Sequence, residues 1–242
     1  MRDKKNLKKL LNLNYLDLTN RTICYGKYDL PSVYCRLETD PDYIALYSQP
    51  CDYHKTENTV VSFYDYDSKF DGVNGLYNAI YYKNEKRLNE FKNRFSGVKY
   101  FISPDYTMAG DVPLYHNLYR YGQSREVALW FTLELGVTTI PNIPCSSILD
   151  LEFICDGLAD VDTVAFSTKG RNSELDKKLI TKSLILVLDR LPKLKKIIVY
   201  DVSRNNKSIN ELFAPAIDRG IRIIIPDNSL KIRNILGVKF NV

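Results

Sequence analysis

The chain has 242 residues, of which 45% are hydrophobic and 26% charged, and its formal net charge at pH 7 is +5. This composition is too apolar for a disordered protein and is sufficient for one sizeable hydrophobic core. The apolar runs fall far short of the roughly 20 residues that a membrane-spanning helix needs, and the charged residues 1–12 do not resemble a secretory signal. We therefore expect a cytoplasmic protein with no membrane partner. The 34 basic and 29 acidic residues are intermixed, so the charge permits nucleic-acid binding without requiring it.

The five cysteines are an odd number at irregular spacing, and no two of them form a Cys-x-x-Cys pair. A disulfide framework is therefore not expected. Cys51 and His54 have the spacing of metal ligands, but no second pair completes the four ligands of a structural zinc site.

The first residues differ from the rest of the chain. Leucines at positions 7, 10, 11 and 13 predict a short amphipathic helix in residues 1–18, which packs on the body or engages a partner. Residues 19–242 are predicted to form a single α/β domain. Within it, residues 19–58 are rich in Tyr, Pro, Asp and Cys and show only two short strand-like runs, 22–25 and 43–47.

From residue 60 onward, short β-branched or aromatic runs alternate with helical stretches. Six strands are predicted, at residues 60–64, 99–103, 138–142, 163–167, 196–200 and 222–226. Periodic apolar positions predict helices at residues 76–91, 113–135, 147–155, 175–190 and 209–219. Gly97, Gly136 and Gly220 each follow a predicted helix and precede a predicted strand, as expected of helix-stop residues.

Strands that are apolar throughout and are joined by crossover helices predict an α/β fold with a mainly parallel sheet. Two architectures fit this pattern. One is an open doubly wound sheet, and the other is an incomplete TIM-like barrel to which runs 22–25 and 43–47 contribute further strands.

Polar residues follow each predicted strand, at the edge where parallel α/β folds bind their ligands. Carboxylates at this edge can hold a divalent cation such as Mg²⁺ or Mn²⁺, or share a proton for acid-base chemistry. The alternative is that each aspartate caps the next helix or makes a turn. The candidate metal ligands are Asp105, Asp201 and Asp227.

The segment Ser167-Thr168-Lys169-Gly170-Arg171 combines hydroxyls, a glycine and two cations after a buried strand. These groups suit a phosphate, although the segment lacks the spacing of a Walker loop. Arg120 and Arg125, in the long predicted helix, can offer guanidinium groups to phosphate or can form structural ion pairs.

A series of motifs occurs in a distinctive order along the chain. They are Ser103-Pro104-Asp105-Tyr106 with Asp111 and Pro113, Ser124-Arg125, Ile140-Pro141-Asn142, Phe153 with Cys155-Asp156-Gly157-Leu158, Ser167-Thr168-Lys169-Gly170, and residues 197–200. Because these motifs follow one another in this order, the chain resembles the domain-of-unknown-function family four-four-one-seven. That family occurs in bacteria, their phages and mobile elements. The resemblance covers about residues 43–200 and implies an origin and a set of shared positions rather than a mechanism.

The chain departs from the family pattern at three points. The family has two arginines two positions apart, whereas Arg120 and Arg125 are separated here by an insertion. Cys145 occupies the position of an expected aromatic residue, and Asp201 that of an expected glycine. A site shared by the family is therefore expected to be altered in this chain.

Three hypotheses of function follow from the sequence. The first is an accessory protein of a phage or mobile element that binds nucleic acid or a nucleotide-like phosphate ligand through Arg125, Ser167, Thr168 and Lys169. The second is a metal-assisted phosphoester hydrolase or transferase, and the third a non-catalytic inhibitor or adaptor of a host protein. The sequence leaves open whether the protein is an enzyme.

The sharpest structural prediction concerns one cleft at the carboxyl end of the sheet. It should contain Asp105, Arg125, Asn142, Asp156 and Ser167. Asp105, Asn142 and Ser167 each fall at or just past a strand end, and neighbouring strands lie roughly 4.8 Å apart.

Overall fold

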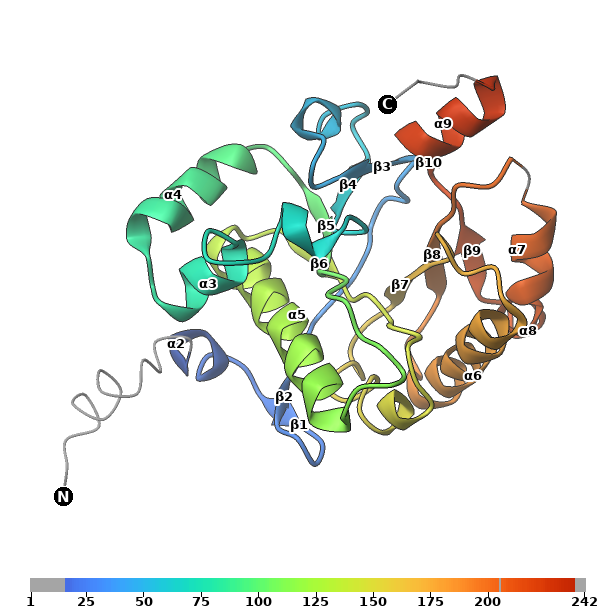
Figure 1. The fold of residues 1–242 in the computed structure, drawn as a ribbon, viewed down its shortest axis with the longest axis horizontal. Helices are drawn as coiled ribbons and strands as arrows, with labels where there is room; N and C mark the ends of the chain where they lie inside the picture. The colour runs from blue at the N-terminus through green and yellow to red at the C-terminus, as the bar shows by residue number, and fades with distance from the viewer. Residues whose placement is uncertain (1–15, 205, 238–242) are drawn as a thin grey trace.

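In the computed structural model, residues 16–204 and 206–237 are described, and two sets of parallel strands lie at the centre of the molecule (Figure 1). One set has the order β10-β3-β4-β5-β6 and the other the order β7-β8-β9, with every neighbouring pair parallel. The strands are β3 (Tyr43–Leu46), β4 (Thr59–Ser62), β5 (Tyr100–Ile102), β6 (Thr138–Ile140), β7 (Thr163–Ser167), β8 (Lys196–Tyr200), β9 (Arg222–Ile224) and β10 (Asp227–Asn228).

The two sets close into one ring. On one side, a parallel bridge between Asn142 and Ala165 joins the end of β6 to β7. On the other side, residues 222–228 pair first with β8, as β9, and then with β3, as β10. Pro226 lies between the two pairings and has no amide hydrogen to continue the ladder with β8. The ring thus has seven strand positions, six from β3 to β8 and one from the β9–β10 segment.

The fold is therefore a parallel α/β barrel, and of the two predicted architectures the open doubly wound sheet is wrong. Run 43–47 supplies β3, as the barrel alternative required. Run 22–25 does not join the ring, because β1 (Cys24–Tyr25) pairs antiparallel with β2 (Leu30–Pro31) in a separate hairpin. The residue after β1, Gly26, has φ 78°, a backbone conformation that favours glycine.

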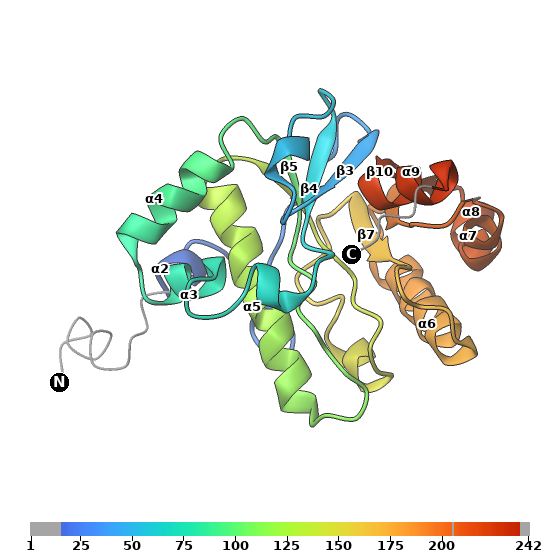
Figure 2. The same ribbon diagram turned by 45° about the horizontal axis from the view of Figure 1, so that its top comes forward.

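Helices cover the ring on two sides (Figures 1 and 2). On one side lie α2 (Leu16–Thr19), α3 (Leu76–Tyr81), α4 (Glu85–Arg94) and α5 (Leu114–Glu134). On the other side lie α6 (Glu174–Arg190), α7 (Lys207–Leu212) and α8 (Ala214–Asp218), and α9 (Ser229–Leu236) follows β10. Short 3-10 helices occur in loops of the described chain, namely η1 (Pro50–Asp52), η2 (Asp67–Lys69) and η3 (Leu149–Glu152).

Three predicted helices differ from the observed ones for local reasons. The predicted helix 76–91 ends at α3 because Lys83 has a left-handed φ of 51°, and Asn84 then caps α4 by accepting from Arg87 N at 3.2 Å. The predicted helix 209–219 is divided near Phe213, since Pro215 cannot donate the next helical hydrogen bond. The predicted helix 147–155 is only the single turn η3.

Two hydrophobic clusters fill the space inside the ring and around it. Along β3 and β4, side chains alternate between them, so that Ile44 and Val60 belong to one cluster and Ala45 and Val61 to the other. The second cluster lies under α3, α4 and α5 and is rich in aromatic rings. At its centre Phe101 of β5 stacks on Phe131 of α5, with 4.0 Å between ring centroids.

Gly97, Gly136 and Gly220 have φ values of 77°, 67° and 76°, which confirms the three predicted helix-stop positions. In the described parts of the chain, no helix is both long and apolar enough to cross a bilayer. Of the predicted N-terminal helix, residues 1–15 lie outside the described residues, and α2 packs against α5. The division into residues 1–18 and 19–242 stays a prediction.

Candidate functional site at the strand-end rim

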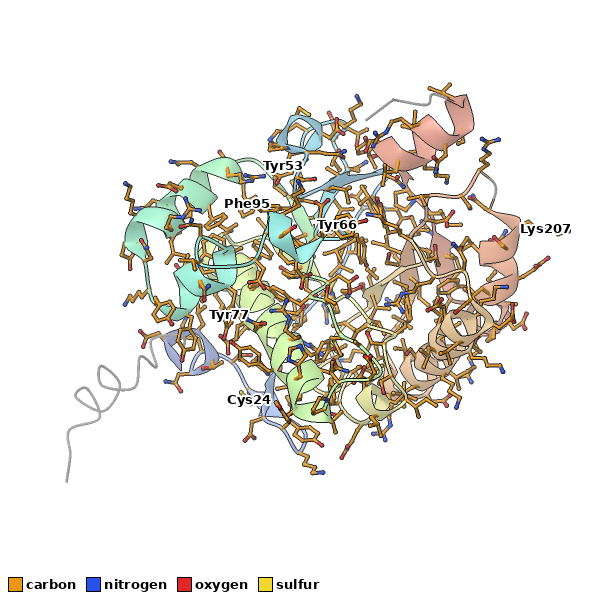
Figure 3. All side chains as sticks on the ribbon, in the orientation of Figure 1. Cys24, Tyr53, Tyr66, Tyr77, Phe95 and Lys207 are labelled. Atoms are coloured by element: carbon orange, nitrogen blue, oxygen red, sulfur yellow. The ribbon has the colours of Figure 1, made fainter. Side chains whose placement is uncertain are left out.

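A pocket of about 230 Å³ opens at the carboxyl ends of the strands. Residues at the ends of β4, β5 and β7 and in the loops that follow them form its wall. One of these residues, Tyr66, is labelled near the centre of Figure 3. We call it the rim pocket, and its lining residues are Tyr64, Asp65, Tyr66, Asp105, Ser167, Lys169 and Gly170. Of the sequence-predicted site, it brings together Asp105, Ser167 and Lys169.

Asn142 organises one side of the rim pocket. Its Nδ2 donates to Asp105 Oδ1 at 2.8 Å, and its Oδ1 accepts from Tyr64 Oη at 2.8 Å. Its backbone N–H donates to Ser103 Oγ at 2.9 Å. These bonds join the ends of β4, β5 and β6, so the position of the Asp105 carboxyl group is set by three neighbouring strands.

The Asp105 carboxyl group lies in a partly desolvated place. Burial raises its pKa above the ordinary value of 3.8, and the cations of Arg171 and Lys169 and the hydrogen bond from Asn142 act in the opposite direction. Asp105 is therefore easier to protonate than a carboxyl group in water, and a protonated Asp105 can donate a hydrogen bond into the pocket.

Lys169 is the cation in the wall of the rim pocket. Its Nζ donates to Tyr64 O at 3.0 Å and lies 5.8 Å from the centroid of the Tyr66 ring. The Tyr66 side chain is 79% exposed, so one aromatic face is available to a ligand. An ammonium group beside an exposed ring suits a ligand that carries both an anion and a flat apolar group.

Thr168, predicted to contact phosphate, is engaged elsewhere. Its Oγ1 donates to Asp201 Oδ1 at 2.8 Å and its backbone N–H to Tyr200 O at 3.1 Å. Asp201 Oδ2 in turn accepts from Ser203 N at 3.0 Å. Thr168 and Asp201 thus tie the loop after β7 to the loop after β8.

The three predicted metal ligands do not form a metal site. Asp105 is held by Asn142 and Asp201 by Thr168, whereas Asp227 lies 3.9 Å from Lys231 Nζ and its side chain is 62% exposed. In residues 16–204 and 206–237, no group of three or more His, Cys, Asp or Glu side chains has a metal-binding arrangement. The predicted Mg²⁺ or Mn²⁺ site at these aspartates therefore has no support from the described side chains, because each carboxylate serves a different loop.

Arg125 and Asp156 lie together but away from the rim pocket, contrary to the sequence-based expectation. Arg125 is 1% exposed and donates through Nη2 to Tyr121 Oη at 2.7 Å and to Asp156 O at 2.9 Å. The Asp156 carboxylate occupies the space where a side chain at Gly26 of the hairpin would lie. The loop with Asp156 leads into β7, so it lies at the amino end of that strand, whereas Ser167 is its last residue.

Arg120 is a structural ion-pair residue. Its guanidinium group pairs with Asp67 and, at 2.8 Å, with Asp71 Oδ2, and it lies 4.7 Å from the centroid of the Tyr106 ring. Asp67 also accepts from Thr107 N at 3.1 Å. Arg120 thus holds the loops after β4 and β5 against α5.

The tyrosine pair Tyr64 and Tyr200 was not among the predicted site residues. Their rings stack with 5.0 Å between centroids and 16° between planes, and both are buried. The available signal was that each tyrosine is the last residue of a predicted strand, where its ring can enter the mouth of a barrel. Ser103, which accepts from Asn142 N, belongs to one of the family motifs but was not a predicted site residue.

These features define a class: a parallel α/β barrel protein with a polar pocket at the carboxyl edge of its strands, where such folds place their ligand sites. The sequence model of the family described as Domain of unknown function (DUF4417) matches residues 24–217 of the 242. The chain belongs to that family. Neither a curated protein nor a solved structure matches it.

Proposed function

We propose that the protein binds a nucleotide-like phosphate ligand, free or as part of a nucleic acid, in the rim pocket. The observation that carries the proposal is the meeting of Ser167, Lys169 and Gly170 with the exposed ring of Tyr66 in that pocket. Lys169 supplies a positive charge and hydrogen-bond donors for a phosphate, Ser167 supplies a hydroxyl, and Tyr66 a face on which a base can stack.

The shape of the loop at Gly170 supports phosphate binding there. Gly170 has φ 74°, and a Cβ at this position would meet no atom within 4 Å. A ligand can therefore approach the backbone N–H groups of the loop without a side chain in the way. Arg171 donates through Nη1 to Cys145 O at 2.7 Å and holds the far end of the same loop.

Asp105 is a carboxyl group beside a proposed anion site, and burial raises its pKa, so it takes up a proton more easily than a carboxyl group in water when an anion binds next to it. A protonated Asp105 does not repel phosphate and can donate a hydrogen bond to it. Phosphate binding should therefore be accompanied by proton uptake at Asp105. The affinity should fall as pH rises, because a charged Asp105 opposes the ligand.

The family resemblance supports a further part of this proposal, that the protein is an accessory protein of a phage or mobile element. Under this proposal it acts in the cytoplasm, where nucleotides and nucleic acids are found, and not at a membrane. The net charge of +5 is compatible with either form of the ligand.

Calorimetric titration of the full chain with ADP, inorganic phosphate and a single-stranded oligonucleotide tests the proposal at 50 and 200 mM salt. We expect binding of at least one probe that weakens as salt rises, because a charged contact is screened. The substitution Lys169→Ala should weaken it by about 10- to 100-fold, the loss expected for one charge-assisted hydrogen bond. Tyr66→Ala should weaken ADP and oligonucleotide binding but not phosphate binding.

Lys178→Ala is the matched control, because Lys178 is exposed on α6 and its removal changes the net charge by the same amount. Its affinity should equal that of the unmodified chain. If no probe binds at 50 mM salt, or if Lys169→Ala and Lys178→Ala have the same effect, the rim pocket is not a phosphate site.

A further inference from the structure

A second pocket, of about 500 Å³, lies between α3, α5 and the β1–β2 hairpin and shares no lining residue with the rim pocket. Figure 3 labels two of its lining residues, Tyr77 on α3 and Cys24 on the hairpin. We call it the hairpin pocket and define it by its aromatic and acidic lining residues, which are Tyr28, Asp29, Tyr77, Tyr81, Tyr119 and Glu126.

The charged side chains in the wall of the hairpin pocket are both acidic. Asp29 comes from the turn of the hairpin and Glu126 from the middle of α5. None of the lining residues among those described is a lysine, arginine or histidine. The described part of the wall thus contributes acidic groups and no basic one.

Glu126 has a shielded carboxylate oxygen without a partner among the described residues. Its Oε2 is shielded from water and makes no hydrogen bond to any described residue, and the same is true of Thr19 Oγ1 in the same wall. Burial alone raises the pKa of Glu126 from its ordinary value of 4.5 to about 7. A buried polar group without a partner lowers stability, so a group that donates a hydrogen bond to Glu126 at this place would be favoured.

Tyrosine rings line the same space. The ring of Tyr77 contacts Tyr119 edge-on, with 6.3 Å between centroids, and lies 5.9 Å from the ring of Tyr81. Tyr28 adds a ring from the hairpin. A tyrosine face attracts a cation through its quadrupole, and several faces around one space form the cage that recognises ammonium groups.

We propose that the hairpin pocket binds an organic cation, a primary or quaternary ammonium group, held between the tyrosine rings and the carboxylates of Glu126 and Asp29. The aromatic faces favour an organic ammonium over a small metal ion, and the two acidic groups balance its charge. This site is independent of the phosphate ligand proposed at the rim.

The affinity for the cation should depend on whether Glu126 is protonated. The other titratable groups that line the pocket with Glu126 are Tyr77 and Tyr81 on α3, Tyr119 on α5, and Cys24, Tyr28 and Asp29 on the hairpin. Burial raises the pKa of Tyr77 and of Cys24, which keeps both neutral near pH 7. An ammonium group binds charged Glu126 better than neutral Glu126, so the affinity should rise from pH 6 to pH 8.

Two sources can provide the ammonium group. One is a free small amine, and the other is a lysine of this chain, since Lys4, Lys5, Lys8 and Lys9 lie a short way along the chain from Thr19 of the pocket wall. A full chain in which these four lysines are changed to glutamine distinguishes the sources. If it binds an added amine several-fold more tightly than the unmodified chain, the lysines compete for the pocket, and equal affinity indicates a free amine.

Calorimetric titration of the full chain with tetramethylammonium and butylammonium chloride tests the proposal, with sodium chloride at equal ionic strength as the reference. We expect saturable binding of at least one amine at pH 8 and about fivefold or more weaker binding at pH 6. Glu126→Gln should weaken binding at pH 8 about tenfold or more, and Tyr77→Leu should also weaken it.

Glu211→Gln is the matched control, because Glu211 is exposed on α7 and far from the hairpin. It should leave the affinity unchanged, and thermal unfolding shows whether each variant is folded. The proposal is overturned if neither amine binds at pH 8 in the unmodified and four-lysine forms, or if Glu126→Gln binds as well as Glu211→Gln does.

Discussion

Asn142 Nδ2 donates to Asp105 Oδ1 at 2.8 Å, while the other end of the same amide accepts from the buried hydroxyl of Tyr64. The amide therefore satisfies a carboxyl group and a phenol that come from two different neighbouring strand ends. Burial raises the pKa of Tyr64 well above its usual range, so this phenol donates rather than ionises. The rim pocket is thus held in shape before any ligand arrives.

The substitution Asn142→Ala tests this arrangement. It leaves the Tyr64 hydroxyl and the Asp105 carboxyl group without a partner in a buried place, which should lower the free energy of unfolding by about 1–3 kcal/mol. Urea denaturation followed by circular dichroism measures the change. Asn93→Ala, on the exposed face of α4, should change it by less than about 0.5 kcal/mol. Equal effects would mean that the amide does not organise the rim.

The pKa of Glu126 predicts how stability depends on pH in the absence of a ligand. The folded-state pKa, about 7, is above the ordinary value of 4.5, so the folded protein binds this proton more tightly than the unfolded chain does. Its contribution to stability is complete below about pH 4.5 and is lost as pH rises through about 7, a total of about 3 kcal/mol.

Glu126→Gln should remove the part of the pH dependence of stability that comes from Glu126, because a neutral amide has no proton to lose. The variant should gain stability relative to the unmodified chain between pH 5 and pH 8, as measured by urea denaturation at both values. Glu211→Gln, at an exposed position on α7, should show no such gain. A constant difference between Glu126→Gln and the unmodified chain over this range would contradict the raised pKa.

Arg120 should stabilise the two loops that it connects. Arg120→Ala removes partly buried ion pairs with Asp67 and Asp71 and should lower the free energy of unfolding by about 2 kcal/mol. In a double-mutant cycle with Asp71→Ala, the coupling should be about 1–2 kcal/mol and should decrease only slightly in high salt. An additive double mutant would show that the pair makes no net contribution.

Gly157 should tolerate no side chain, because the hairpin packs directly on it. It has φ 70°, and a Cβ there would lie 3.0 Å from Pro31 O and 3.1 Å from Ser32 Cα. Gly220 has φ 76° with no atom near its Cβ position, so Gly220→Ala measures the cost of the backbone conformation alone, about 1–2 kcal/mol. Thermal unfolding should show a larger loss for Gly157→Ala, and equal losses would show that the hairpin moves freely aside.

Much of the fold could be predicted because its strands and helices have local signals. The apolar runs that predicted strands at 163–167 and 196–200 coincide with β7 and β8, since such runs are buried on both faces of a parallel barrel. Asp105, Asn142 and Ser167 were predicted to share one edge from their places at strand ends. In the structure, Asn142 donates a hydrogen bond to Asp105, and Asp105 and Ser167 line one pocket. These positions agree with the predicted shared edge.

The surroundings of a residue whose neighbours are distant along the chain could not be predicted. Arg125 was expected at the rim because its guanidinium group suits phosphate, but it is buried in α5 and donates to carbonyl groups of the loop before β7. Residue type indicates which interactions a side chain can make, and packing decides which of them it makes.

The sequence alone determined the order of parallel strands and helices, the helix stops at glycine, and the polar residues at the strand ends, because each depends on residues within about one turn or one strand. Only the tertiary structure decided that the ring closes, through one segment that changes partner from β8 to β3 at Pro226. It also decided that Glu126 lines a pocket with several tyrosines and with no basic residue among the described lining residues. Ring closure and burial depend on contacts between segments far apart in the chain, and no local pattern of residue types encodes those contacts.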